Sequence, residues 1–275
     1  MTESYIVVGP YLRVTGIATP FPDTVTVMAN GSSIGPRCVS VPPGGASGVY
    51  GAVNGRISGR TIDFTITWDD NLGNAVHAGT VEPDGVTRGT ATGPAVPPEW
   101  HPGPWQTSAG AMAGPADMSV EATELFRLIN DARTHPNKYP PNGDATLAKM
   151  TACPNVFQSS NWLTGTAQAH NSFLASQFID WVNTYPNMHT NPDGSLVGDA
   201  GEAIDMAGYH SSRAEIVATG FPTAADAVRF WMQNDAPFQW GHRNRILDCG
   251  LTQAGAAHLQ GGPGGHYWTV DMGTP

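Results

Sequence analysis

The segment WGHRNRIL, at residues 240–247, combines one imidazole with two guanidinium groups. Histidine changes its charge near neutral pH, so it can donate a proton, accept one or bind a metal ion. His242 therefore either works with partners that lie far away in the sequence or caps a helix as a polar residue. Arg243 and Arg245 can bind an anionic ligand, but we expect them to form structural pairs with carboxylates such as Asp248.

The other reactive side chains carry no signature of a nucleophile. A G-x-S-x-G motif is absent, and Cys153 and Cys249 lack activating neighbours. The three cysteines allow at most one disulfide, and these two are the expected pair because they lie in the same half of the chain. His170 lies on the apolar stripe of a predicted helix, which indicates a hydrogen-bonded core histidine. We expect His77, between strand residues, at the surface.

The first 95 residues are predicted to form an antiparallel β domain, either a sandwich or a small barrel. Apolar and polar residues alternate from residue 61 to residue 68, which is typical of a half-buried strand. Turn signals such as Pro83-Asp84-Gly85 separate this strand from other short strands. No group of chemically active residues stands out here, so we expect an attachment or recognition module. Residues 96–118, rich in Pro and Gly, are predicted to form a linker or a strapped loop that Trp100 and Trp105 pack onto one of the domains.

The pattern becomes helical at Ser119, the predicted N-cap of a first helix. A second helix has its apolar stripe between Leu163 and Trp181, and a third begins at Thr223 with a capping-box-like start. Two strand-like runs, at residues 253–259 and 266–272, close the sequence. Helices with a few strands that do not strictly alternate indicate an α+β domain over residues 119–275.

The composition limits the classes of partner. With 275 residues and 40% hydrophobic residues, the chain can form two cores. A net charge of -10 speaks against nucleic acid or an anionic membrane. No apolar run reaches the roughly 20 residues of a membrane helix, and the first residues do not resemble a signal peptide. Few lysines beside many Ala, Gly, Pro and Arg residues favour a GC-rich genome, such as that of an actinobacterium or its phage.

Six motifs follow one another in the second half of the chain: HNSFLAS, HTNPDGS, AGYHSSRAEIVATG, PTAADAVRFWM, GHRNRIL and YWTVDMG. In this order they resemble the CAP superfamily of cysteine-rich secretory proteins, antigens and pathogenesis-related proteins, and most closely its bacterial branch. The resemblance covers roughly residues 119–275 and leaves the first half unassigned. It implies a three-layer α-β-α sandwich with an open cleft.

The resemblance also implies site residues. In many CAP members the cleft holds two histidines and two acidic residues, which can bind a divalent cation such as zinc. By motif position, His189 and His242 are similar to the two histidines, and Glu215 is similar to the first acidic residue. Glu202, in GEAIDM, precedes AGY and is assigned to the preceding helix instead.

The sequence departs from the family pattern at three places. Glu215 lacks the usual Gly and Asn flanks. Asn234 stands where the second acidic residue is expected, with Asp235 beside it, so the complete tetrad is absent. The inserted segment DAPFQW adds Phe238 and Trp240 at the predicted rim of the ligand cleft.

These observations leave three functions open. The first is an extracellular-type CAP module whose cleft binds a lipid or another surface ligand, with or without zinc or another divalent cation. The second is a metal-dependent hydrolase, of peptidase or esterase type, in which His189, Glu215 and His242 bind the metal and act in catalysis. The third is a structural or host-surface-binding component of a phage tail or another extracellular particle. We prefer binding, because the same side chains can form a buried His–Glu–His hydrogen-bond network without any chemistry.

The expected partners and location follow from these functions. We expect a small apolar ligand or a cell-surface component, no nucleic acid and no transmembrane segment. Any oligomer or particle would assemble through the β domain. The expected location is extracellular or virion-associated, although without a recognisable signal peptide the sequence leaves a cytoplasmic location open.

Overall fold

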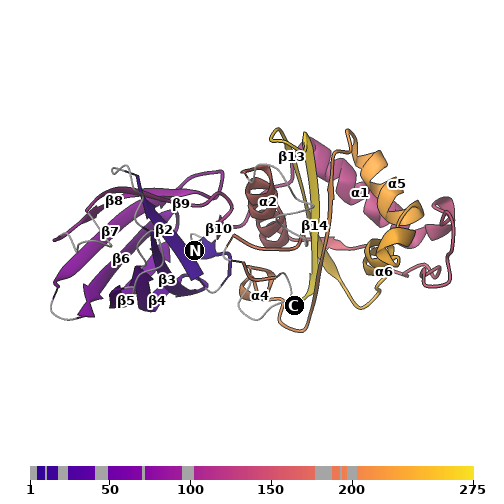
Figure 1. The fold of residues 1–275 in the computed structure, drawn as a ribbon. Coiled ribbons are helices and arrows are strands. Elements are labelled where there is room, and N and C mark those ends of the chain that lie inside the picture. The colour runs from indigo at the N-terminus through magenta and orange to yellow at the C-terminus, as the bar shows by residue number, and fades with distance from the viewer. Residues whose placement is uncertain are drawn as a thin grey trace. The chain divides into compact units, whose positions relative to one another are not determined.

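The fold is that of a computed structural model, which describes residues 5–9, 11–17, 24–40, 49–69, 72–94, 102–176, 188–192, 194–196 and 203–275. The chain divides into two compact units, which are described separately (Figure 1). The first unit comprises Met1–Gly114 and Thr190–Met206, and the second comprises Pro115–His189 and Ala207–Pro275.

A closed barrel of antiparallel strands forms most of the first unit (Figure 1). Neighbours in sequence pair with each other, and the last strand pairs back with the first through Val14 and Thr107. Of the two predicted architectures, sandwich and barrel, the structure therefore has the barrel. Its strands are β2 (Tyr11–Gly16), β3 (Thr24–Asn30), β4 (Ser33–Ser40), β5 (Val49–Ser58), β6 (Thr61–Trp68), β7 (Asn74–Val81), β8 (Thr87–Thr92) and β9 (Gly103–Thr107).

Short elements among the described residues also belong to the first unit. Strands β1 (Ile6–Val7) and β10 (Met112–Ala113) form a separate antiparallel pair. Helix α4 (Ala203–Met206) precedes the return of the chain to the second unit. Glu202 and the residues just before it lie outside the described residues.

The interior of the barrel follows the alternation in the sequence. In β6, Ile62, Phe64, Ile66 and Trp68 are buried, and the residues between them face outward. Burying an aliphatic or aromatic side chain of this size contributes about 1.5–3 kcal/mol, so the period-2 pattern both identifies the strand and fixes its inner face. The prediction for residues 61–68 is confirmed.

The predicted linker at residues 96–118 differs from the structure in its described part, residues 102–118. That part contains β9, whose Trp105 is buried in the barrel. A Cβ atom at Gly79 or Gly89 would lie 2.8 or 2.6 Å from ring carbons of Trp105, so both glycines make room for the indole. The Pro and Gly content suggested a linker, whereas the buried Trp105 and Thr107 mark a strand. Trp100 and His101 lie outside the described residues.

His77 lies inside the barrel. The sequence had suggested a position at the surface, and that prediction is wrong. His77 is the register partner of Phe64, and the two rings stack with their centroids 4.4 Å apart. The strand β7 turns Ala75, His77 and Val81 inward, which leaves Val76 exposed. Burial lowers the pKa of His77 to about 4, because the low-dielectric interior disfavours the charged ring.

We expect His77 to make the barrel sensitive to acid. The pKa is about 4 in the folded state and near 6.5 in the unfolded state, so between these values the unfolded chain binds more protons. Stability therefore falls as the pH falls, by about 2 kcal/mol between pH 7 and pH 4.5. Urea unfolding at the two pH values should show a smaller loss for His77→Gln than for the wild type. His135→Gln, at an exposed histidine, should show the wild-type loss; equal losses in all three proteins would contradict the assignment.

The second unit is built on a sheet of four strands with the order β11-β13-β14-β12. Their bounds are β11 (Gln158–Ser159), β12 (Ser212–Thr219), β13 (Gln253–Gln260) and β14 (His266–Thr274). Strand β14 is antiparallel to both β12 and β13, and β11 is parallel to β13. Both predicted C-terminal strands are confirmed.

Helices cover both faces of this sheet (Figure 1). On one face lies α2 (Asn161–Ser176), and on the other lie α1 (Val120–Thr134), α5 (Ala224–Gln233) and α6 (Gly241–Ile246). Two 3-10 turns, η2 (Pro136–Lys138) and η3 (Ala236–Phe238), follow α1 and α5. Because both faces are covered, β14 is buried along nearly its whole length.

The helix starts agree with the sequence. The Ser119 hydroxyl accepts the Ala122 N–H at 3.1 Å, and the Thr223 hydroxyl accepts the Asp226 N–H at 3.2 Å. Such caps are worth about 1 kcal/mol each. The second predicted helix is present as α2, but the end of its stripe, up to Trp181, lies outside the described residues.

A disulfide joins Cys153 to Cys249, the pair expected from the sequence. It connects the segment after α1 with the segment after α6. Cys38 is a free cysteine buried in the barrel. No helix within the described ranges is long and apolar enough to cross a membrane.

Candidate functional site

The first candidate site surrounds Glu215, on strand β12. Its carboxylate is nearly inaccessible, with 2% of the side chain exposed. His189 places Nδ1 2.7 Å from Oε1, and His170, on α2, places Nδ1 3.4 Å from Oε2. The structure thus brings together the predicted residues His189 and Glu215. We call Glu215, His170 and His189 the Glu215 cluster.

His170 was predicted to be buried and hydrogen-bonded, and it is, but the sequence did not indicate that it belongs to a site. Its Nε2 lies 2.8 Å from the Met188 carbonyl oxygen, which can only accept, so Nε2 carries a proton. Burial lowers the pKa of His170 to about 4, so the ring is neutral at neutral pH. The helical stripe predicted burial, but only the folded chain shows which carboxylate lies beside it.

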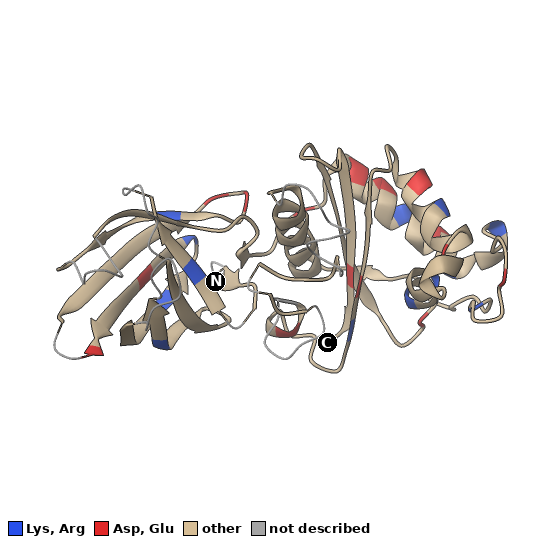
Figure 2. Cartoon of the chain, viewed as in Figure 1, with Lys and Arg blue, Asp and Glu red and all other residues tan. Residues whose placement is uncertain are grey.

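Asp271 adds a second acidic group next to the Glu215 cluster. It is the register partner of Glu215 on β14, and its Oδ2 accepts the Thr166 hydroxyl at 2.5 Å. Burial lowers the pKa of His189, and the charge of Asp271 partly opposes this change. Helix α2 carries no charged residue of its own (Figure 2). Glu215 and Asp271, the two acidic groups at this cluster, come from the strands β12 and β14.

The second candidate site surrounds His242, the second residue of α6. Its Nδ1 lies 2.5 Å from Oδ1 of Asp235, whose side chain is fully buried. The other carboxylate oxygen of Asp235 accepts the Arg243 backbone N–H at 3.1 Å. Asp235 thus binds an N–H at the start of α6, while Trp240 is its N-cap without a side-chain bond. His242 does not cap the helix, and we call His242 and Asp235 the His242 pair.

Aromatic rings from α5 and from η3 lie around His242. The rings of Phe230, Trp231 and Phe238 have centroids 5.8, 6.4 and 5.3 Å from the imidazole. Phe238 exposes 55% of its surface. Trp240 was predicted at the rim of the cleft but is buried, and its Nε1 donates to the Asp144 carbonyl at 2.7 Å.

The predicted meeting of His242 with His189 and Glu215 is not what the structure contains. Glu215 is bonded on the face of the sheet that α2 covers, whereas His242 lies on α6, beyond the opposite face (Figure 1). Motif order shows which residues belong to the family pattern, but it does not show which face of the sheet they occupy. Asn234 also lies away from His242, where its side-chain oxygen accepts the Asn142 amide at 2.8 Å. The carboxylate that serves His242 is its neighbour, Asp235.

The two sites differ from a three-ligand metal centre. In the part of the chain that the structure describes, no three His, Cys, Asp or Glu side chains are arranged to hold a metal ion. In the Glu215 cluster, Nδ1 of His189 is hydrogen-bonded to one carboxylate oxygen, Nδ1 of His170 lies 3.4 Å from the other, and the Nε2 atom of His170 is already used by the Met188 carbonyl. The contacts that the structure contains here are hydrogen bonds, from His189 to Glu215 and from His170 to the Met188 carbonyl.

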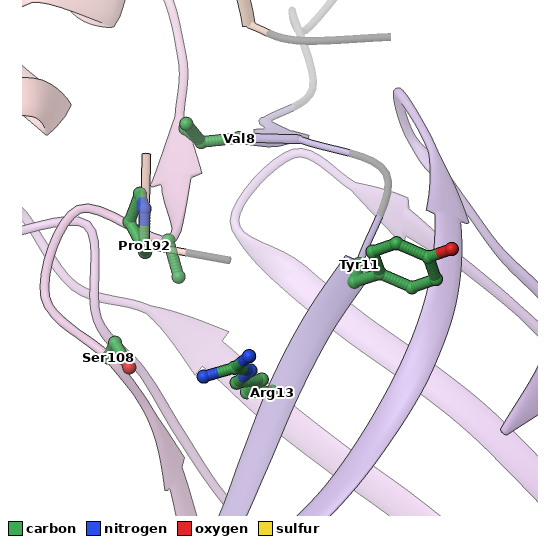
Figure 3. Close-up of a pocket in the computed structure, with 6 residues that line it drawn as sticks. Val8, Tyr11, Arg13, Ser108 and Pro192 are labelled. Carbon is green, nitrogen blue, oxygen red and sulfur yellow. The ribbon is translucent and has the colours of Figure 1, made fainter. Parts of the chain in front are cut away.

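A small hollow on the first unit indicates less about function than the two sites on the second unit do. In Figure 3, Arg13 extends from β2 between Tyr11 and Ser108, and it is the one charged residue in the lining. A single exposed guanidinium in a shallow hollow does not define a ligand class. The lining residues are Val8, Tyr11, Arg13, Ser108, Ala111 and Pro192.

A helix-covered sheet with this order of histidine motifs defines a CAP-type domain, and a comparison with known families agrees. Residues 126–272 match CAP, the Cysteine-rich secretory protein family. Because the match spans more than half of the chain, the protein belongs to the CAP family. The resemblance noted in the sequence is confirmed, and the barrel strands, which all precede residue 108, lie outside the match. Comparisons with curated proteins and with solved structures gave no match.

Proposed function

We propose that the second unit is a non-enzymatic binding module for an apolar ligand, such as a lipid chain or an apolar group of a cell-surface molecule. The proposed binding surface consists of Phe221, Phe230 and Phe238, and we call it the aromatic surface. Phe221 and Phe230 stack with centroids 5.0 Å apart, and Phe238 meets Phe230 edge to face at 5.8 Å. The observation that carries the proposal is the exposure of Phe238, at 55%, directly beside His242. Exposed apolar patches with polar neighbours mark interaction sites.

The His242 pair supplies a polar contact at the edge of this surface. Because Asp235 binds Nδ1, the proton of a neutral ring is held on that nitrogen and Nε2 is left as an acceptor. The described residues offer Nε2 no hydrogen bond, and 14% of the His242 side chain is exposed. A hydroxyl or another polar head of a bound ligand can therefore donate to Nε2 while its apolar part lies on the phenyl rings.

The arrangement of the two sites supports binding over metal-dependent hydrolysis. A zinc hydrolase needs its ligands and general base at one reaction centre. Here His189 and Glu215 contact each other on the α2 face, and His242 contacts Asp235 beyond the opposite face. We therefore assign the Glu215 cluster a structural role, in which it joins β12, α2 and the segment at His189.

We also propose an extracellular location, with the first unit as an attachment module. The Cys153–Cys249 disulfide supports this location, because disulfides persist in oxidising compartments. Tyr11 and Met28 face each other on adjacent strands of the barrel and are both exposed, which supports a role of the barrel wall in contacts. Attachment to a cell or to a particle would fit this module equally.

Binding of a fluorescent long-chain fatty acid to the full chain tests the proposed function. We expect Phe238→Ala to weaken binding about tenfold. A tenfold change in affinity corresponds to about 1.4 kcal/mol, which is less than the free energy that burial of one phenyl ring contributes. The matched control is Val156→Ala, which truncates an apolar side chain of similar exposure, 53%, in the same unit. Equal affinities of the two variants would rule out the aromatic surface. If the wild type does not bind the probe, the proposed ligand class is wrong.

A further inference from the structure

Two histidines lie side by side where strands β13 and β14 meet at their hairpin. Nε2 of His258 is 3.0 Å from Nδ1 of His266, and the ring planes differ by 16°. Both side chains are partly exposed. At this distance one nitrogen donates its proton and the other accepts it, so at least one of the rings is neutral. We call His258 and His266 the hairpin histidines.

The spacing of these nitrogens suits a metal ion as well as a shared proton. Imidazole nitrogens bind zinc at about 2.0–2.1 Å, and two of them at a right angle would be about 3 Å apart. When the proton of the donating ring moves to that ring's other nitrogen, both facing nitrogens present a lone pair. Each ring must then turn until its lone pair points at the ion instead of at the other ring, which partly exposed side chains can do.

Neighbouring residues prepare the hairpin histidines for a cation. The indole of Trp268 stacks under His258 at 3.9 Å, and the paired strands hold the backbone of both histidines rigid. Burial, and to a lesser extent His266, lowers the pKa of His258 and favours the neutral ring that a metal requires. The negative charge of Glu121, at the start of α1, partly opposes this change in the pKa of His258.

We propose that the hairpin histidines bind one divalent transition-metal ion that prefers imidazole, namely copper, nickel or zinc. Magnesium and calcium are excluded by their preference for oxygen ligands. Within the described residues no third His, Cys, Asp or Glu side chain completes the group, so water fills the remaining positions. The site is separate from the Glu215 cluster, because the Trp268 ring beneath it belongs to the core under α1 and α5.

Titration of the EDTA-treated full chain with Ni²⁺, followed by calorimetry, tests this site. We expect one ion per chain, a loss of affinity of about tenfold or more in His258→Gln and in His266→Gln, and no binding of Mg²⁺. The electron paramagnetic resonance spectrum of the Cu²⁺ complex should show two nitrogen ligands in the wild type. His135→Gln, at an exposed histidine elsewhere in the unit, should bind like the wild type.

Other results would overturn the proposal. These are an absence of stoichiometric binding in the wild type, or unchanged binding in the double variant of His258 and His266. Loss of the ion in His189→Gln with retention in His258→Gln would assign the metal to the Glu215 cluster instead. Thermal unfolding of each variant shows whether the substitution removed only a metal-binding side chain or also disrupted the fold.

Discussion

Removal of the disulfide by the double substitution Cys153→Ser, Cys249→Ser is expected to lower the free energy of unfolding of the second unit by about 4–5 kcal/mol. The bond links residues 96 positions apart, and in the chain-entropy account a crosslink over about 100 residues restricts the unfolded chain by that amount. This is a large part of the 5–15 kcal/mol that stabilises a typical domain. Urea denaturation followed by circular dichroism measures the change.

A reducing agent provides the control for this prediction. It should destabilise the wild type by a similar amount and leave the double variant unchanged. Cys38→Ala, which removes the free thiol of the barrel, should keep the full sensitivity to reduction. A double variant as stable as the oxidised wild type would show that the native contacts alone hold the two segments together.

Substitution of Arg243 by Met is expected to destabilise the second unit by about 3–5 kcal/mol. The guanidinium is buried and donates to the carbonyl oxygens of Tyr139, Met232 and Lys149 at 2.7, 2.6 and 2.8 Å. The sequence suggested a pair with a carboxylate such as Asp248, but the side chain instead joins three backbone segments. Each buried carbonyl that loses its donor costs about 1–3 kcal/mol, and Asp235 would lose a nearby positive charge.

Arg245 is the matched control, because it lies two residues later on the same helix and is exposed. Arg245→Met should change the free energy of unfolding by less than about 0.5 kcal/mol. Denaturant titration of both variants makes the comparison. If the two substitutions cost the same, the carbonyl contacts of Arg243 do not stabilise the unit.

Local features of this fold were predictable because neighbours in sequence cause them. The Ser119 and Thr223 caps, the alternation in β6 and the two C-terminal strands depend on residues only a few positions apart. Closure of the barrel was not predictable in the same way. Closure depends on pairing between Val14 and Thr107, which lie far apart in the sequence. In addition, β9 was not predicted as a strand because its segment is rich in Pro and Gly, a composition that is also typical of linkers.

The candidate site was predictable in its residues but not in its geometry. Motif order identified His189 and Glu215, which do contact each other, and it also identified His242, which does not join them. His170 was expected to be buried, but the sequence could not show that its ring faces Glu215. Whether two elements contact each other depends on which face of the sheet each of them covers. The order of motifs along the sequence carries little information about that face.

The position of β14 has a consequence for the order in which the chain can fold during synthesis. This strand is internal in its sheet, between β13 and β12, yet it spans His266–Thr274. The barrel strands, in contrast, all precede residue 108. The barrel can therefore close while the ribosome is still elongating the chain, whereas β12 has no partner strand until residue 274 has emerged.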